Sequence, residues 1–225
     1  MNNIYIPSAG AEQWTQFLAE PVKHWRTGFS ARTLAYYWES AIGFPFEVGA
    51  ALATEPKFDD IKLLLAIPEH QVHLPGGSRP SQNDIWVLAR AGKELVSIAV
   101  EGKVAEPFGP TVQDWLADGS PGKTARLAFL CNALALNEQA LGPIRYQLLH
   151  RAASAVIEAR RFCASHAVML VHSFSESQQW FDDYESFAAL FGSQVGTDSV
   201  ACVGRPDGIH LYLCWVCGDR KFLMK

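Results

Sequence analysis

The chain has 225 residues, 49% of them hydrophobic, so it is long enough to form one domain with a sizeable core. No apolar stretch approaches the roughly 20 residues that span a bilayer, which excludes a transmembrane helix and predicts no membrane partner. The net charge of −4 argues against broad electrostatic binding to nucleic acid. It does not exclude a metal-dependent nuclease, because acidic metal ligands count as negative until the ion binds.

The N-terminus and the cysteines bear on location. The opening residues MNNIYIPSAGAEQW contain neither the basic segment nor the apolar segment of a secretory signal. Five cysteines, an odd number scattered among apolar residues, are typical of reduced thiols rather than of a disulfide framework. We therefore expect a cytoplasmic protein.

An aromatic N-terminal extension is followed by segments that Pro or Gly interrupts. Ser30 is a candidate N-cap for the first predicted helix. The helices predicted in this part of the chain cover residues 31–41, 46–53 and 58–66. A short strand is then expected over 70–74, where apolar and polar residues alternate before a Pro-Gly-Gly turn.

The clearest pattern is the stretch from Ser81 to Lys103, which predicts two strands joined by a tight turn. Asp84 opens the first strand, and Glu101-Gly102-Lys103 closes the second. Because successive side chains of a strand point to opposite faces, Glu101 and Lys103 share one face while Gly102 faces away. If Asp84 pairs near the end of the second strand, two carboxylates and an ammonium group meet at one edge of a sheet.

This group of side chains suits a particular chemistry. Two carboxylates offer the oxygen ligands that Mg²⁺ or Mn²⁺ prefers. A lysine beside them could position or activate a water molecule, or stabilise the charge that develops during attack on phosphorus. The alternative is an ordinary hairpin whose exposed ends carry charged residues.

The rest of the chain alternates helical and strand patterns. Predicted helices cover 111–117, 124–136, 144–165 and 178–191, and predicted strands cover 167–171 and 209–216. The middle of the chain therefore runs helix, three strands, helix, strand, with the acidic residues on the second and third strands. This order is typical of a mixed α/β fold.

The element order and the acidic hairpin together resemble the restriction-endonuclease-like core of the PD-(D/E)XK phosphodiesterase superfamily. The resemblance covers roughly residues 31–175. It implies an α/β fold with a central mixed sheet flanked by helices. The chain would then be a single domain, with an N-terminal extension over 1–30 and a C-terminal helix and strand within 176–225.

The resemblance also implies roles for the residues of the hairpin. Asp84 and Glu101 would bind Mg²⁺ or Mn²⁺, and Lys103 would be catalytic. Asn83 stands where the superfamily commonly has a proline. A further glutamate usually completes the site. Glu39, Glu47 and Glu69 compete for that place: Glu69 is nearest in sequence, whereas the other two lie on predicted helices, where the superfamily usually has this residue.

Members of the superfamily often carry a glutamine on the helix that follows this hairpin. Helical spacing places Gln147, His150 and Arg151 on one face of the predicted helix. Gln147 would hold the lysine or a water molecule, and Arg145, His150 and Arg151 would bind substrate phosphate. The alternative is that this face is the solvated side of an amphipathic helix.

Two other motifs have simpler explanations. Residues 117–124 fit a relaxed phosphate-loop pattern, but no apolar strand precedes them, so we expect a turn that leads into a helix. Cys202, His210, Cys214 and Cys217 have the side chains of a zinc site. Strand alternation would place Cys214 and Cys217 on opposite faces, so we expect no structural zinc.

The sequence thus favours a metal-dependent nuclease that hydrolyses phosphodiester bonds of nucleic acid, with DNA favoured and a homodimer left open. The alternative is the same nuclease fold without catalysis, used as a binding or protein-interaction module. A globular domain with a different enzymatic role on a small molecule is a third interpretation.

Overall fold

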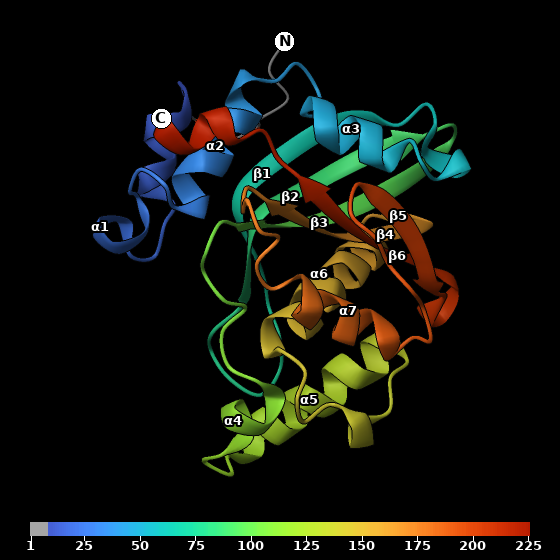
Figure 1. Ribbon diagram of the computed structural model, residues 1–225. Coiled ribbons are helices and arrows are strands. Elements are labelled where there is room, and N and C mark those ends of the chain that lie inside the picture. The colour runs from blue at the N-terminus through green and yellow to red at the C-terminus, as the bar shows by residue number, and fades with distance from the viewer. Residues whose placement is uncertain (1–8) are drawn as a thin grey trace.

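The computed structural model describes residues 9–225, which form one open, six-stranded sheet flanked by helices (Figure 1). The strand order is β1-β2-β3-β4-β6-β5. The strands are β1 (Lys62–Val72), β2 (Ser81–Ala91), β3 (Glu94–Lys103), β4 (His166–Ser173), β5 (Ser199–Gly204) and β6 (His210–Cys217). The sheet is mixed, because β3, β4 and β6 run parallel while the other neighbouring pairs are antiparallel. The mixed α/β architecture with a flanked central sheet agrees with the sequence.

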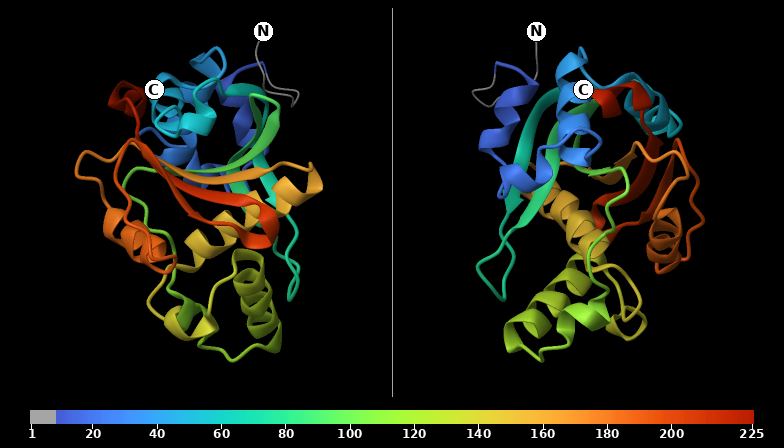
Figure 2. Two further views of the ribbon diagram at one scale, coloured as in Figure 1. Left: turned by 90° about the vertical axis from the view of Figure 1, so that its right-hand side faces the viewer. Right: turned by 60° about the vertical axis from the view of Figure 1, so that its left-hand side comes forward.

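Helices cover both faces of the sheet (Figure 2). They are α1 (Pro21–His24), α2 (Ser30–Ser40), α3 (Phe46–Leu52), α4 (Val112–Leu116), α5 (Pro121–Leu134), α6 (Tyr146–Arg161) and α7 (Phe181–Ala189). Helix α6 packs on β3 and β4, with α5 and α7 against it, whereas α2 and α3 pack on the opposite face. Among the described residues no helix is both long and apolar enough to cross a bilayer.

Strand alternation divides the core between the two faces. Val96, Ile98 and Val100 of β3 belong to the core under α2 and α3, whereas Ala99 belongs to the core under α6. Both faces of this strand are covered, and apart from Glu94 at its start and the buried Ser97, its polar side chains lie at its C-terminal end. The site described below lies at that end.

The N-terminal half of the sheet corrects the sequence prediction. Residues 58–66 were expected to form a helix, but only a 3-10 turn over Pro56–Phe58 precedes β1. The short, mostly apolar run from Lys62 to Ile67 fits a strand or a helix equally well. It forms a strand because it pairs with β2. Pro68 is tolerated because β1 lies at the edge of the sheet, where a missing N–H leaves no ladder bond unmade. Strand β5 is a second difference, because no strand is predicted over its residues.

The remaining predicted elements are present with shifted ends. Ser30 is the first residue of α2 rather than its N-cap, which is Phe29. The long predicted helix over 144–165 is α6, which begins at Tyr146 and ends at Arg161. The hairpin of β2 and β3 is confirmed, with Gly92 and Lys93 in its turn.

Candidate functional site

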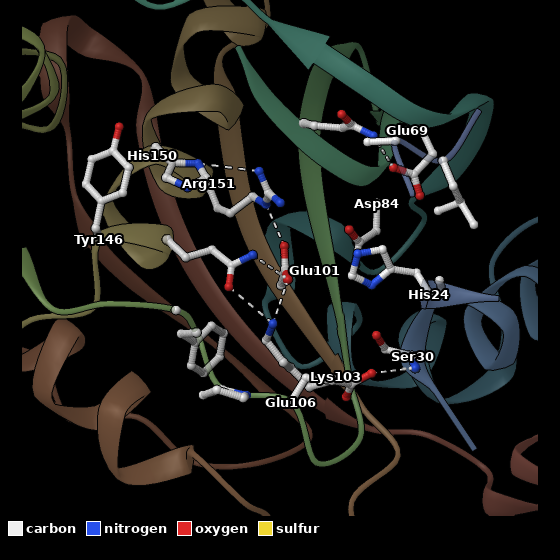
Figure 3. Close-up of a pocket in the computed structure, with 18 of the residues that line it drawn as sticks. His24, Ser30, Glu69, Asp84, Glu101, Lys103, Glu106, Tyr146, His150 and Arg151 are labelled. Carbon is white, nitrogen blue, oxygen red and sulfur yellow. Dashed lines mark hydrogen bonds and ion pairs between the residues drawn. The ribbon is translucent and has the colours of Figure 1, made fainter. Parts of the chain in front are cut away.

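Three acidic residues lie in one row across β1, β2 and β3. The β-pairing matches Pro68 with Ile85 and His70 with Asn83, which brings Glu69 level with Asp84. The neighbouring pairing matches Ile85 with Val100, which brings Asp84 level with Glu101. All three acids line one pocket of about 530 Å³ together with Lys103 (Figure 3). The expected meeting of carboxylates and an ammonium group at one sheet edge is therefore confirmed.

Asp84 interrupts the pairing of its strand. The pairs of β2 with β3 end at Ile85 with Val100, and Oδ2 of Asp84 accepts the backbone N–H of Gly102 at 2.8 Å. A Cβ at Gly102 would lie 3.3 Å from that oxygen and 3.3 Å from Cδ2 of Leu34 on α2. Glycine therefore suits this position because the aspartate and the helix both approach the backbone closely.

Glu101 is bound by cations on both of its oxygens. Lys103 Nζ lies 2.7 Å from Oε1, and Arg151 Nε lies 2.5 Å from Oε2. Gln147 donates to Oε1 at 2.8 Å and accepts from Lys103 Nζ at 3.2 Å. Burial alone would raise the pKa of Glu101, but the charges of Arg151 and Lys103 outweigh it and lower that pKa to about 2. Glu101 is thus a carboxylate at every physiological pH.

Glu69 and Asp84 are in the opposite electrostatic situation. Burial, together with the negative charge of Glu101, raises the pKa of Asp84 to about 7. Burial, together with the charge of Asp84, raises the pKa of Glu69 to about 8. Their closest polar partners are neutral: the Gly102 amide for Asp84, and Gln82 Nε2 at 2.6 Å from Glu69. This part of the pocket holds more negative charge than its protein partners neutralise.

Glu69 also has an unusual backbone. Its φ of 51° lies in the left-handed region, which residues other than glycine seldom occupy. Such conformations cost about 1–3 kcal/mol and persist where the surrounding structure imposes them, often at functional sites. The backbone here turns the carboxylate from an edge strand into the pocket.

Helix α6 supplies the polar wall of the pocket. Gln147 and Arg151 meet Glu101, while His150 Nδ1 lies 2.8 Å from Oγ of Ser81. Burial, followed by the charge of Arg151, holds the pKa of His150 well below its ordinary value. The interpretation of this face as solvated is wrong: Arg151 is only 5% exposed, and Ser154 is fully buried.

Several predicted site residues lie elsewhere. Arg145 pairs with Asp183 at 2.9 Å, donates to the carbonyl of Gly109 and does not line the pocket. Glu39 accepts a hydrogen bond from the indole of Trp14, and Glu47 lies on α3; neither lines the pocket. Of the three competing glutamates, the structure therefore places Glu69 beside Asp84.

The pocket also contains residues that the sequence did not single out. Glu106 accepts the backbone N–H groups of Ser30 at 2.8 Å and Val104 at 2.9 Å, which ties the start of α2 to the end of β3. His24 reaches the pocket from α1. Glu106 lies three residues after Lys103 but outside any motif, whereas His24 reaches the site through long-range packing.

The carboxylates of the pocket fit only one kind of metal site. Within residues 9–225 no group of three or more His, Cys, Asp or Glu side chains is arranged to hold one. Mg²⁺, however, is commonly held by only one or two carboxylates and keeps water or phosphate as its other ligands. The unneutralised pair of Asp84 and Glu69 fits that kind of site. Cys214 and Cys217 belong to the cores on opposite faces of the sheet, as strand alternation predicted.

Comparison with known proteins gives one match. A family model described as a domain of unknown function, DUF6946, matches residues 7–220. No curated protein and no solved structure matches the chain. The match covers nearly the whole chain, so the sheet, its helices and the pocket all belong to one family unit.

Proposed function

Because the chain belongs to the DUF6946 family, whose description names no activity, we propose a function from the site itself: metal-dependent hydrolysis of phosphodiester bonds in nucleic acid. We include in this proposal a restriction-endonuclease-like core. The observation that carries it is the row of Glu69, Asp84 and Glu101, with Lys103 beside it, in one pocket. The order of the elements along the chain supports the same interpretation: α2 comes first, then three antiparallel strands, then α6 and a parallel strand.

In this proposal Asp84 and Glu69 hold Mg²⁺ or Mn²⁺. The ion would supply polarisation of the scissile phosphate and a bound water of lowered pKa. Asp84 was expected from the sequence to share the ion with Glu101. Both oxygens of Glu101 already bind cationic side chains, so Glu69 is the better second ligand.

Lys103 is the group that acts on the reacting atoms. Its Nζ is held between Glu101 Oε1 and Gln147 Oε1, which fixes where its remaining N–H can point. From there it donates to the attacking water or to a phosphate oxygen and stabilises the charge that develops. Glu101 and Gln147 position the lysine, and Arg151 in turn positions Glu101.

The proposal also names a substrate and a cellular location. The phosphodiester is that of nucleic acid, with DNA favoured, as the resemblance implies. All five cysteines are free, which suits a reducing compartment, so we place the activity in the cytoplasm.

One observation favours a second candidate, a non-catalytic binding module. Glu101, Lys103, Gln147 and Arg151 form a network that is complete without any ion. Such a network stabilises a fold whether or not the pocket turns over a substrate. A binding module for an ion, however, has little use for an ammonium group beside its carboxylates, so the lysine distinguishes the two candidates.

The test is cleavage of single- and double-stranded DNA and RNA with Mg²⁺ or Mn²⁺, by wild type and by Lys103→Ala. We expect cleavage to fall by a factor of about 10²–10⁴, the usual effect of losing a positioned charge-stabilising or proton-transfer group. Mn²⁺ affinity should stay the same or rise, because one positive charge is removed. Lys123→Ala is the matched control, since Lys123 pairs with Asp118 outside the pocket.

Two results would contradict the proposal. Cleavage that survives Lys103→Ala undiminished would assign the activity to another site or to a contaminant. No cleavage of any of the four nucleic acids by the wild type would favour the binding module.

A further inference from the structure

His24 faces the pocket from the side that the hairpin and α6 do not cover. It is the last residue of α1, and it lines the pocket together with Leu18 and Ala19. Figure 3 shows its ring directed towards Asp84, on the side of Asp84 away from His150 and Arg151. Its imidazole makes no hydrogen bond or ion pair with any residue within 9–225.

The position of His24 is held by the residues that follow it. The indole of Trp25 donates to Oε2 of Glu12 at 3.1 Å. Arg32 of α2 binds Oε1 of the same glutamate at 3.2 Å and lies over the Trp25 ring, 5.9 Å from its centroid. Tyr36 donates to the same oxygen of Glu12. The chain next to His24 is thus anchored to α2, so the free imidazole sits on a fixed support.

The other basic side chains of the pocket already have partners. Lys103 and Arg151 are bound to Glu101, and His150 is bound to Ser81. Of the basic residues described in the pocket lining, His24 is therefore the one whose side chain has no hydrogen-bond or ion-pair partner. Its place across Asp84 from the α6 wall matters, because nucleophile and leaving group lie on opposite sides of phosphorus in an in-line displacement.

We propose that His24 is the proton donor to the leaving oxygen of the phosphodiester, an inference that rests on the proposed function. The oxygen of a water molecule forms a bond to phosphorus on the Lys103 side. The bond from phosphorus to the leaving oxygen breaks, and that oxygen takes the electron pair and the proton of the His24 ring. The attacking water releases its proton to solvent, and His24 regains one from solvent. The products are an alcohol and a phosphate monoester.

This role specifies the substrates that need His24. A sugar hydroxyl of nucleic acid is a poor leaving group as the alkoxide, so it gains from a proton donor. A nitrophenolate is stable as an anion and leaves without a proton. Substrates of the two kinds should therefore depend on His24 to very different extents, whereas a purely structural residue would affect both equally.

The experiment measures Mn²⁺-dependent cleavage of DNA and of bis(p-nitrophenyl) phosphate by wild type, His24→Ala and Lys23→Ala. We expect His24→Ala to lose a factor of about 10²–10⁴ on DNA and to stay within about threefold of wild type on the nitrophenyl ester. Lys23→Ala is the matched control, because Lys23 is the exposed neighbour of His24 and does not line the pocket. Thermal unfolding of both variants should match that of the wild type.

Each other outcome overturns a distinct part of the argument. An equal loss on both substrates would make His24 a structural or binding residue, and no loss on either would remove it from the reaction. Loss of Mn²⁺ binding in calorimetry of His24→Ala would make it a metal ligand instead. A wild type that cleaves neither substrate would overturn the proposed function and this inference with it.

Discussion

The two halves of the pocket treat their carboxylates in opposite ways. On the α6 side, Glu101 is matched by Lys103 and Arg151, and its pKa is lowered to about 2. On the β1 side, Asp84 and Glu69 face one another with only neutral donors, and their pKa values rise to about 7 and 8. The first half is complete as it stands. The second half binds protons near neutral pH, and in the proposed function it binds a cation in their place.

This difference teaches how one row of acids can serve two purposes. Burial acts on all three carboxylates, so the partners decide the outcome. A carboxylate with two cations becomes part of the framework that positions Lys103. Carboxylates without cations store an unfavourable charge that a divalent ion would relieve. Four predictions test this division, beginning with the largest expected effect.

Replacing both acids of the unneutralised half should abolish metal binding. In Asp84→Asn with Glu69→Gln, we expect no heat of Mn²⁺ binding in titration calorimetry, because both proposed carboxylate ligands are gone. Glu101→Gln is the comparison variant, and it should retain binding within about tenfold of wild type, since its oxygens are already occupied. Equal loss of binding in Glu101→Gln would move the ion to the α6 half and break the comparison.

Breaking the neutralised half should instead cost stability. Arg151→Ala leaves the buried Glu101 with only one cation, and removing one partner of a buried ion pair usually costs about 3–5 kcal/mol of unfolding free energy. Denaturant unfolding measures the loss. Arg160 lies on the same helix and forms an exposed pair with Asp207. Arg160→Ala should therefore cost at most about 1 kcal/mol. Similar losses in the two variants would show that Glu101 does not depend on its cation.

The raised pKa values predict a pH dependence of metal-free stability. A folded-state pKa above that of the unfolded chain means that the folded protein binds protons more tightly, so stability falls as pH rises towards the folded value. For Asp84 and Glu69 this loss runs from about pH 4 to about pH 8. Glu101, with its lowered pKa, contributes stability that is lost only below about pH 4.

The measurement compares melting temperatures in chelator, wild type against Asp84→Asn with Glu69→Gln. The buried His150 and His172 have lowered pKa values and act in the opposite direction in weak acid, so the difference between the proteins is the relevant quantity. The melting temperature of the variant minus that of the wild type should increase from pH 5 to pH 8. The increase should be about 2–4 °C for each kcal/mol of relieved repulsion. A constant difference would contradict the raised pKa values.

The smallest effect concerns two matched glutamines. Gln82 donates to Glu69 as Gln147 donates to Glu101. Gln82→Ala removes the neutral donor that favours the charged form of Glu69, so Mn²⁺ affinity should fall by about tenfold or less. Gln147→Ala should leave Mn²⁺ affinity unchanged and lower cleavage through Lys103. The reverse pattern would show that the two halves do not act separately.

The hairpin could be predicted because its geometry is local. A tight turn fixes the register of β2 with β3, and alternation then fixes which side chains share a face, so Asp84, Glu101 and Lys103 followed from the sequence. Gln147 and Arg151 followed in the same way from the helical repeat. Their proposed roles are not tested by the geometry, but their convergence is confirmed.

The rest of the site depends on long-range packing. The run from Lys62 to Ile67 fits either secondary structure, so the length of β1, and with it the place of Glu69, was not readable from the sequence. Arg145 precedes α6 by one residue, and its direction is set by Asp183, which is distant in sequence. His24 lies in no motif, and the packing of its segment on α2, including the bond of Trp25 to Glu12, brings it to the pocket.

The backbone of β1 has a consequence for contacts between copies of the protein. Among the described strands β1 lies at one edge of the sheet, a position that commonly invites strand addition and fibril growth. Pro68 offers no N–H there, and β1 shifts its register with β2 between Leu63 and Leu65, which makes this edge irregular. The proline and this register shift therefore make the edge a poor template for edge-to-edge aggregation.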